Sequence, residues 1–149
     1  GILKSAQSLI GKLSGERDRW QNQVAELQAG LEKIPLNALL AAGCITYLGG
    51  FAEDEREAKL KEWNQMGHLG EFDFVKFMSK ESEILQFKAD GLPGDILSIQ
   101  NALIIQNPTQ TPFIIDPNTQ ATKWLRKELG KSTSVEVVMQ QEQRFVNAL

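Results

Sequence analysis

The first 34 residues carry apolar positions at alternating spacings of three and four. This pattern predicts a helix whose narrow apolar stripe packs against a partner helix in a coiled coil. The stripe, called the seam below, consists of Leu3, Ala6, Ile10, Leu13, Arg17, Trp20, Val24, Leu27, Leu31 and Ile34. Arg17 is the one charged residue in it, and Gly11, Gly15 and Gly30 each weaken the helix by about 1 kcal/mol relative to Ala. The helix is therefore expected to need a partner, although an amphipathic helix lying on its own domain is the alternative interpretation.

Pro35 separates the seam from the rest of the chain. Because proline lacks an amide N–H and restricts the backbone, the seam helix is expected to end or kink near Ile34. Pro35 can then occupy the first turn of the next helix. The pattern thus predicts two parts, a coiled-coil strand over residues 1–34 and a folded module over residues 35–149.

Two helices are expected early in this module. Residues 36–48 are apolar on every face, which is typical of a helix buried on all sides, and a Gly-Gly pair ends it. Residues 53–66 combine acidic and basic side chains four positions apart with Leu60, Trp63 and Met66 on one side. This second pattern predicts a helix with a charged, solvated face and one buried side.

The second half of the module alternates helices with two expected strands. Asp95 lies in a turn and is placed to cap a helix that runs through residues 98–103. Residues 112–116 form a short apolar run, and residues 135–139 are rich in β-branched side chains, so both are expected to be strands. Residues 121–129 between them predict a helix, which Gly130 would end.

A strand, a helix and a second strand at this spacing predict a right-handed parallel crossover, the βαβ unit of an α/β sheet. Glu142 would begin the helix that follows. The expected fold class is therefore α/β and mostly helical, with a long N-terminal coiled-coil helix that leads into the βαβ unit.

The composition narrows the range of partners. Lys and Arg number 16 against 19 Asp and Glu, and the net charge of −3 leaves no surplus of positive charge for a nucleic acid. The longest apolar run, residues 36–48, is shorter than the roughly 20 residues of a bilayer span, so no membrane partner is expected. Cys44 is the single cysteine, which excludes an internal disulfide and fits a reducing compartment.

The residues offer no catalytic set. The single histidine, His68, is placed in a surface loop and is assigned no role, and no Ser/His/Asp set can be assembled around it. No two carboxylates are spaced as an acid/base pair, and Cys44 has no Cys or His near it at metal-ligand spacing. The segment by itself is therefore expected to be no enzyme and to hold no metal.

The turn before the helix at residues 121–129 has the position of a P-loop but not its residues. A P-loop surrounds phosphates with backbone N–H groups of glycines and adds a Lys and a hydroxyl. Here Asp116 stands at the first Gly, Ala121 at the second, and Lys123 comes one residue late. A carboxylate about 4 Å from a phosphate adds about 4 kcal/mol of repulsion at an effective dielectric of about 20. An ordinary strand-to-helix turn is thus preferred over a phosphate site.

This degenerate loop, in which no cofactor is expected, comprises Asp116, Pro117, Asn118, Thr119, Gln120, Ala121, Thr122 and Lys123.

Several short motifs in a fixed order resemble the dynein heavy chain family. They are GERDRW at residues 15–20, YLGGF at 47–51, Trp63, GLPGD at 91–95, SIQN at 98–101, PFIIDP at 112–117 and QATKWL at 120–125. The resemblance covers nearly the whole chain. It implies the end of the descending strand of the microtubule-binding stalk, followed by the first half of the fifth module of an AAA+ motor ring, which is a partial P-loop NTPase unit.

The resemblance implies a mechanical role in a microtubule motor. ATP and magnesium would act in other modules of a longer parent chain, and this segment would relay ring changes to the stalk without hydrolysis at its own loop. The implied partners are the ascending stalk strand, neighbouring AAA+ modules, dynein complex subunits, and the microtubule through the distant stalk tip. The implied location is the cytoplasm and cytoskeleton, or a ciliary or flagellar axoneme.

The residues leave two other functions open. An AAA+ module with ATP-binding activity of its own would need phosphate contacts that the loop lacks, and nucleotide titration distinguishes it. A free-standing coiled-coil adaptor without motor function would dimerise through residues 3–34, and the mass of the chain in solution distinguishes that one.

Overall fold

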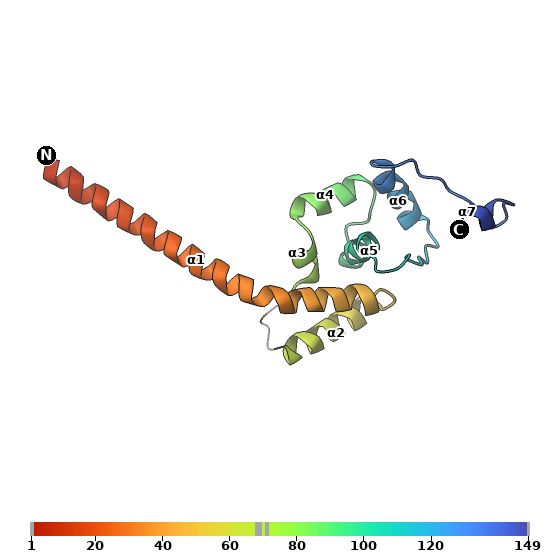
Figure 1. The fold of residues 1–149 in the computed structure, drawn as a ribbon, viewed down its shortest axis with the longest axis horizontal. Coiled ribbons are helices and arrows are strands. Elements are labelled where there is room, and N and C mark those ends of the chain that lie inside the picture. The colour runs from red at the N-terminus through yellow and green to blue at the C-terminus, as the bar shows by residue number, and fades with distance from the viewer. Residues whose placement is uncertain (1, 68–69, 71, 149) are drawn as a thin grey trace.

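The computed structural model describes residues 2–67, 70 and 72–148, and His68 lies outside these described residues. Its helices are α1 (Ile2–Tyr47), α2 (Glu53–Met66), α3 (Phe74–Met78), α4 (Glu81–Ala89), α5 (Ile96–Gln106), α6 (Gln120–Gly130) and α7 (Phe145–Ala148). The first half of α1 projects away from the other helices (Figure 1). Beside its second half, α2 lies on one side and α3 to α6 lie on the other, so the fold consists of a long arm and a small helical body.

One continuous helix carries the seam and enters the helical body. α1 runs through the predicted boundary at Ile34, with Pro35 inside it. Because Pro35 cannot donate to the preceding turn, it weakens the helical ladder locally. The axis of α1 changes direction in its orange part (Figure 1), which is the behaviour expected of a proline in a helix. The helix therefore bends without ending, and the arm and its base are one element.

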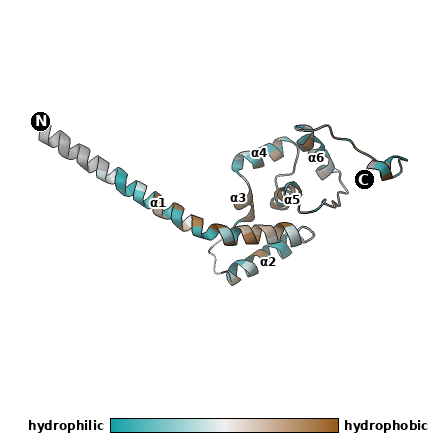
Figure 2. Ribbon diagram, in the orientation of Figure 1, coloured by the Kyte–Doolittle hydropathy of each residue, from teal (hydrophilic) through white to brown (hydrophobic). Residues whose placement is uncertain are grey.

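The core forms where the second half of α1 meets the helices of the body. α1 packs against α2 and α3, and α3 packs against α5. Figure 2 shows hydrophobic residues gathered in this half of α1 and in α5. The buried core residues are Ala41, Cys44, Leu48, Phe74, Phe87, Leu92, Ile99, Ala102, Leu103 and Trp124. The rings of Phe87 in α4 and Trp124 in α6 meet edge to face with centroids 5.5 Å apart, a geometry that aromatic pairs favour.

The base of α1 is buried on one face only. Ala41, Cys44 and Leu48 are buried, whereas Leu39 is 66% and Tyr47 is 70% exposed. The prediction of a helix buried on all sides is therefore wrong for the described residues. The physical reason is that residues 41, 44 and 48, three and four positions apart, share one face. The other helices cover this face and leave the opposite one in solvent.

Local capping explains where two helices begin. The Asp95 carboxylate accepts the N–H of Ser98 at 2.8 Å, so α5 begins directly after the predicted cap. Asp73 accepts the N–H of Lys76 at 3.1 Å and begins α3 in the same way. The predicted helix at residues 53–66 is confirmed with the same bounds. Its expected apolar side is only partly formed, since Met66 is 74% exposed.

The two predicted strands are not paired in the described part of the chain. Residues 112–116 and 135–139 lie outside helices and form no β ladder there. A strand needs a neighbour to receive its backbone hydrogen bonds, and these two runs do not lie against each other as a pair. Phe113 is 93% and Ile115 is 85% exposed, whereas Ile114 between them is half-buried, so two large apolar side chains of the first run remain in solvent. Of the predicted βαβ unit, the structure contains the helix, α6, while the helix expected from Glu142 is limited to α7.

Candidate functional site

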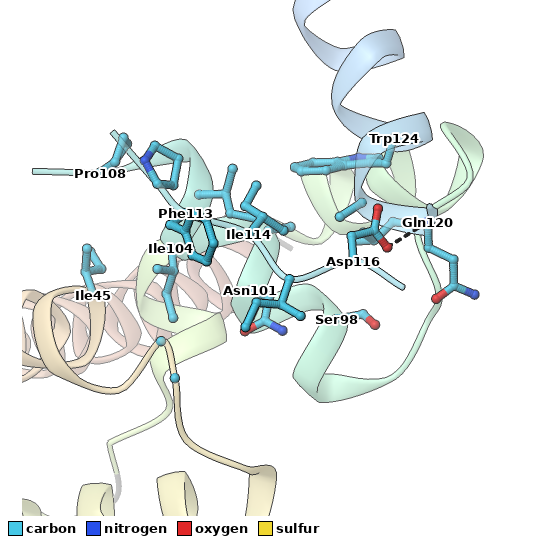
Figure 3. Close-up of a pocket in the computed structure, with 18 of the residues that line it drawn as sticks. Ile45, Ser98, Asn101, Ile104, Pro108, Phe113, Ile114, Asp116, Gln120 and Trp124 are labelled. Carbon is cyan, nitrogen blue, oxygen red and sulfur yellow. Dashed lines mark hydrogen bonds between the residues drawn. The ribbon is translucent and has the colours of Figure 1, made fainter. Parts of the chain in front are cut away.

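A cavity of about 690 Å³ lies between the end of α1, α5, the segment of residues 108–118 and the start of α6. Ser98 and Asn101 of α5 bring polar groups to it, and Ile104 and Trp124 bring apolar surface (Figure 3). The predicted degenerate loop forms its edge at the N-terminus of α6. The cavity therefore adjoins the loop whose position in the sequence corresponds to that of a P-loop.

The carboxylate of Asp116 occupies the N-terminus of α6. Its Oδ1 accepts the N–H of Gln120 at 2.9 Å, and its Oδ2 accepts the N–H and the hydroxyl of Thr122 at 2.8 and 2.9 Å. Thr119, with a φ of 57°, makes the left-handed turn between the carboxylate and the helix. These hydrogen bonds, the one from the Thr122 N–H foremost, hold the pKa of Asp116 below its ordinary value. Asp116 thus caps the helix with a built-in anion.

This arrangement does not fit the phosphates of a nucleotide. A phosphate at a helix N-terminus is bound by free backbone N–H groups. Those of Gln120 and Thr122 already donate to Asp116. Among the described residues that line the cavity, Asp116 is also the only charged one. A phosphate placed here would meet a carboxylate and no cation, which is unfavourable.

The other residues of the loop do not supply the missing contacts. Pro117 and Asn118 form the turn and lie at the cavity edge, and the Thr119 N–H donates to the Asp116 carbonyl at 3.2 Å. Ala121 lines the cavity without a polar side chain. Lys123 is exposed outside the cavity lining, and its N–H donates to the Thr119 carbonyl at 3.1 Å. The lysine therefore belongs to the first turn of α6, with its side chain in solvent.

The described part of the seam is open to solvent. For Leu3, Ala6, Ile10 and Leu13 the structure describes the helical backbone alone, and Arg17 is exposed. The exposed fractions are 64% for Trp20, 52% for Val24, 68% for Leu27, 63% for Leu31 and 46% for Ile34. A row of large apolar side chains at this spacing is typical of a surface that another helix covers. The described residues contain no such helix, so the coiled coil stays a prediction.

Sequence reasoning missed Arg56 of α2. Its place in a charged stretch predicts a solvated side chain, yet it is 1% exposed. Nη1 donates to Oε1 of Gln100 at 3.1 Å, and Nη2 donates to Oδ1 of Asn101 and to the carbonyls of Gly49 and Phe51 at 3.0, 3.2 and 3.1 Å. Burial lowers the pKa of the guanidinium below its ordinary range. The one signal in the sequence is a Gly-Gly pair a few residues before an arginine, because the backbone carbonyls of such a turn lack helical partners and can accept from a nearby side chain.

Cys44 lies in the core near this arginine and is fully buried. Burial raises the pKa of its thiol to about 11, and the positive charge of Arg56 offsets this effect only in part. The thiol is therefore protonated at neutral pH and acts as a small apolar side chain.

Two kinds of site are absent from the described part of the chain. No group of His, Cys, Asp and Glu side chains there is arranged to hold a metal ion. None of the helices described above combines the length and apolar character that a membrane span requires.

The chain matches known motor proteins along nearly its whole length. Residues 85–149 match the protein family described as "ATP-binding dynein motor region". Cytoplasmic dynein 2 heavy chain 1 is 45% identical over 147 residues in Mus musculus and 45% identical over 150 residues in Chlamydomonas reinhardtii. Both matches cover 99% of this chain. The chain is homologous to a segment of the dynein heavy chains.

A more distant dynein agrees with this assignment. Dynein axonemal heavy chain 6 of Homo sapiens is 28% identical over 153 residues, again covering 99% of this chain. The chain spans only 3 to 4% of the length of these dynein relatives. The matched motor region contains α5, the cavity segment and α6, whereas Arg56 and the seam lie in the part covered by the heavy-chain relatives.

Proposed function

We propose that this dynein segment is a mechanical link in a microtubule motor and turns over no ATP itself. The observation that carries the proposal is the course of α1. One helix bears the exposed seam on its arm and the buried core residues Ala41 and Cys44 at its base, directly before the buried Leu48. A displacement of the helical body therefore acts directly on the arm, because packed interfaces shift between discrete arrangements rather than deforming continuously.

The arm is proposed to be the end of the descending stalk strand, over residues 1–34, paired along the seam with an ascending strand. Trp20, Leu27 and Leu31 support this assignment, since each exposes more than half of its side chain at coiled-coil spacing. Arg17 and the glycines near it weaken the seam. A weak seam can hold two registers of similar free energy, so that a small bias from the ring selects one of them.

Residues 35–149 are proposed to be the first half of the fifth AAA+ module of a motor ring. Its neighbours would supply the sheet that residues 112–116 and 135–139 lack within this chain. The exposure of Phe113 and Ile115 supports this proposal, because a run with such residues in solvent is stabilised when further strands cover it. The βαβ unit would then be completed in the ring.

ATP and magnesium are proposed to act in other modules of the parent chain. The support is the position of Asp116, which takes the N–H groups that a phosphate would need and adds a negative charge beside them. Lys123 does not reach the cavity lining and so offers no compensation. The segment is thus a non-hydrolysing member of an ATP-driven assembly.

The names of the relatives suggest the setting. They are cytoplasmic dynein 2 and axonemal dynein heavy chains. The proposed partners are accordingly neighbouring ring modules, dynein complex subunits and, through the stalk tip, the microtubule. The proposed location is the cytoskeleton of the cytoplasm and of the cilium or flagellum.

A register trap tests the proposal. In the full-length heavy chain that contains this segment, Leu27→Cys is combined with a cysteine on the ascending strand at each of two positions one turn apart. Disulfide formation in either register is expected to make microtubule affinity independent of nucleotide while ATP hydrolysis continues in other modules. Ala29→Cys, on the opposite face of the arm, is the matched control. Nucleotide-dependent affinity that survives both traps would contradict the proposal.

A further inference from the structure

We infer that Arg56 is the positioning residue that couples α1 to α5, so that a shift of the cavity wall reaches the base of the arm. The inference rests on the proposed function, because it names the joint through which the relay passes. It is carried by four hydrogen bonds of one buried guanidinium and by the close packing of α1 on α2.

The first step is that α1 and α2 move as one unit. A Cβ atom at Gly43 of α1 would lie 3.1 Å from the ring of Trp63 in α2, closer than ordinary van der Waals contact, so the two helices pack tightly at this point. Within the same unit, Nη2 of Arg56 donates to the carbonyls of Gly49 and Phe51 in the connecting turn. The turn and both helices are thereby held in one arrangement.

The second step is that the same guanidinium also forms hydrogen bonds to α5, which lies outside this unit. Gln100 and Asn101 accept from Nη1 and Nη2 at 3.1 and 3.0 Å. Asn101 and Gly49 also line the cavity beside α6, so two of the four acceptors belong to its wall. A movement of α5 relative to α1 must therefore stretch hydrogen bonds at Arg56.

The third step is that these bonds resist stretching. Arg56 is 1% exposed, so water has no access to replace a lost acceptor. Its Nε has no partner among the described residues, and each further buried donor that loses its acceptor is unfavourable. The guanidinium is also planar, with its donors in a rigid fork. A lysine would keep the charge but carries a single ammonium that cannot span both helices. The coupling therefore depends on the shape of the arginine as well as on its charge.

Cross-link yields in the full-length heavy chain provide the test. The two seam disulfides of the register trap are formed separately, with and without a non-hydrolysable ATP analogue, and their ratio is the readout. Arg56→Lys, and independently Gln100→Ala with Asn101→Ala, are expected to reduce the nucleotide-dependent change of this ratio by about fivefold or more. The melting temperature is expected to fall, because a buried donor loses its acceptors, while the rate of ATP hydrolysis is expected to stay close to wild type. Arg126→Lys, at an exposed arginine of α6, is the matched control.

The outcomes separate the inference from the proposed function. Variants that fold and keep the wild-type change of the ratio overturn the role of Arg56 and leave the relay intact. A variant that loses the change only together with ATP hydrolysis indicates a structural role and also overturns it. If Arg56→Lys does not fold, the double variant on α5 decides, since it keeps the bonds to Gly49 and Phe51. If the ratio of the two cross-link yields in the wild-type chain does not change with nucleotide, the proposed function and the inference are both overturned.

Discussion

Among the described residues that line the cavity, Asp116 is the one that carries a charge. A carboxylate at a helix N-terminus satisfies backbone N–H groups that would otherwise bind an anion. The Asp116 side chain does this for Gln120 and Thr122 and also holds the Thr122 hydroxyl. One residue thus caps α6 and, in the proposed function, takes the N–H groups that a phosphate would need.

Removal of this carboxylate is expected to loosen the first turn of α6. Asp116→Ala deletes three hydrogen bonds, and loss of an N-terminal cap typically costs about 1 kcal/mol. Amide hydrogen exchange at Gln120 and Thr122 is therefore expected to quicken about fivefold, with no change at Ser98 in α5. Asp95→Ala is the matched control and should reverse the pattern. Unchanged exchange at Thr122 in Asp116→Ala would show that the carboxylate does not cap the helix.

Acid is expected to release the same cap. The pKa of Asp116 is lowered from its ordinary value of 3.8, mainly by the Thr122 N–H. A lowered pKa in the folded state means that the stabilisation is fully present above the unfolded-state value and is lost as the pH falls through the folded-state value. The amide resonance of Thr122 should therefore hold its position from neutral pH down to about 4 and move below that. In Asp116→Asn this titration should disappear, and a shift centred above the ordinary value would contradict the account.

For the helices and turns, agreement between sequence and structure depends on whether the cause is local. Asp95 caps α5 as predicted, and the charged pattern of residues 53–66 gives α2 its bounds, because both depend on neighbours within a few positions. Arg56 breaks the charged-face pattern, since its burial depends on acceptors in α5 that lie far along the chain. Tertiary packing overrides local pattern there.

Pro35 and the expected strands show the same contrast between local sequence effects and tertiary packing. Proline removes one hydrogen bond, which local reasoning treats as a boundary, but the helix continues because its next turns are packed in the core. Residues 112–116 have the composition of a strand and no partner within the described chain. At the candidate site, the sequence shows that Asp116 stands where a P-loop has glycine. Its hydrogen bonds to Thr122 could not be predicted, because they depend on the left-handed turn at Thr119.

The bend of α1 yields a prediction for the whole element. Pro35→Ala restores an N–H to the helical ladder and is expected to straighten the arm, because proline is about 3 kcal/mol less favourable than alanine in a helix interior. Spin labels at Asn22→Cys and Thr46→Cys, both exposed positions of α1, should then give a longer and narrower distance distribution. Cys44 is buried and should remain unlabelled. An unchanged distribution would mean that packing, not Pro35, sets the bend.

On the scale of the whole molecule, a long arm with an exposed seam is joined to a small body with exposed apolar residues. Leu27 and Leu31 on the arm and Phe113 and Ile115 on the body each leave large apolar side chains in solvent. Surfaces of this kind are normally covered in the assembled protein. The proposed role between neighbouring parts of a longer chain would cover these surfaces, and the chain matches only 3 to 4% of the length of a dynein heavy chain.

The cavity gives a prediction about ligands of the molecule. Calorimetry of this chain with ATP and magnesium at millimolar concentration is expected to show no saturable binding. The reason is that the one charged residue among the described residues lining the cavity is Asp116, whose negative charge repels phosphate groups. Asp116→Gly with Thr122→Lys, which moves the loop toward a P-loop, provides the contrasting variant and is expected to gain weak binding at most. A magnesium-dependent isotherm of the unaltered chain would favour an ATP-binding module instead.

The central claim is that α1 carries a change of register between the ring and the stalk. The most direct measurement is a scan of disulfide cross-links between the described seam positions 20–34 and the ascending strand, in the full-length heavy chain with and without nucleotide. The account predicts two sets of cross-linked pairs, displaced by about one helical turn, whose proportions change with nucleotide. A single set of pairs in every nucleotide state would contradict the account.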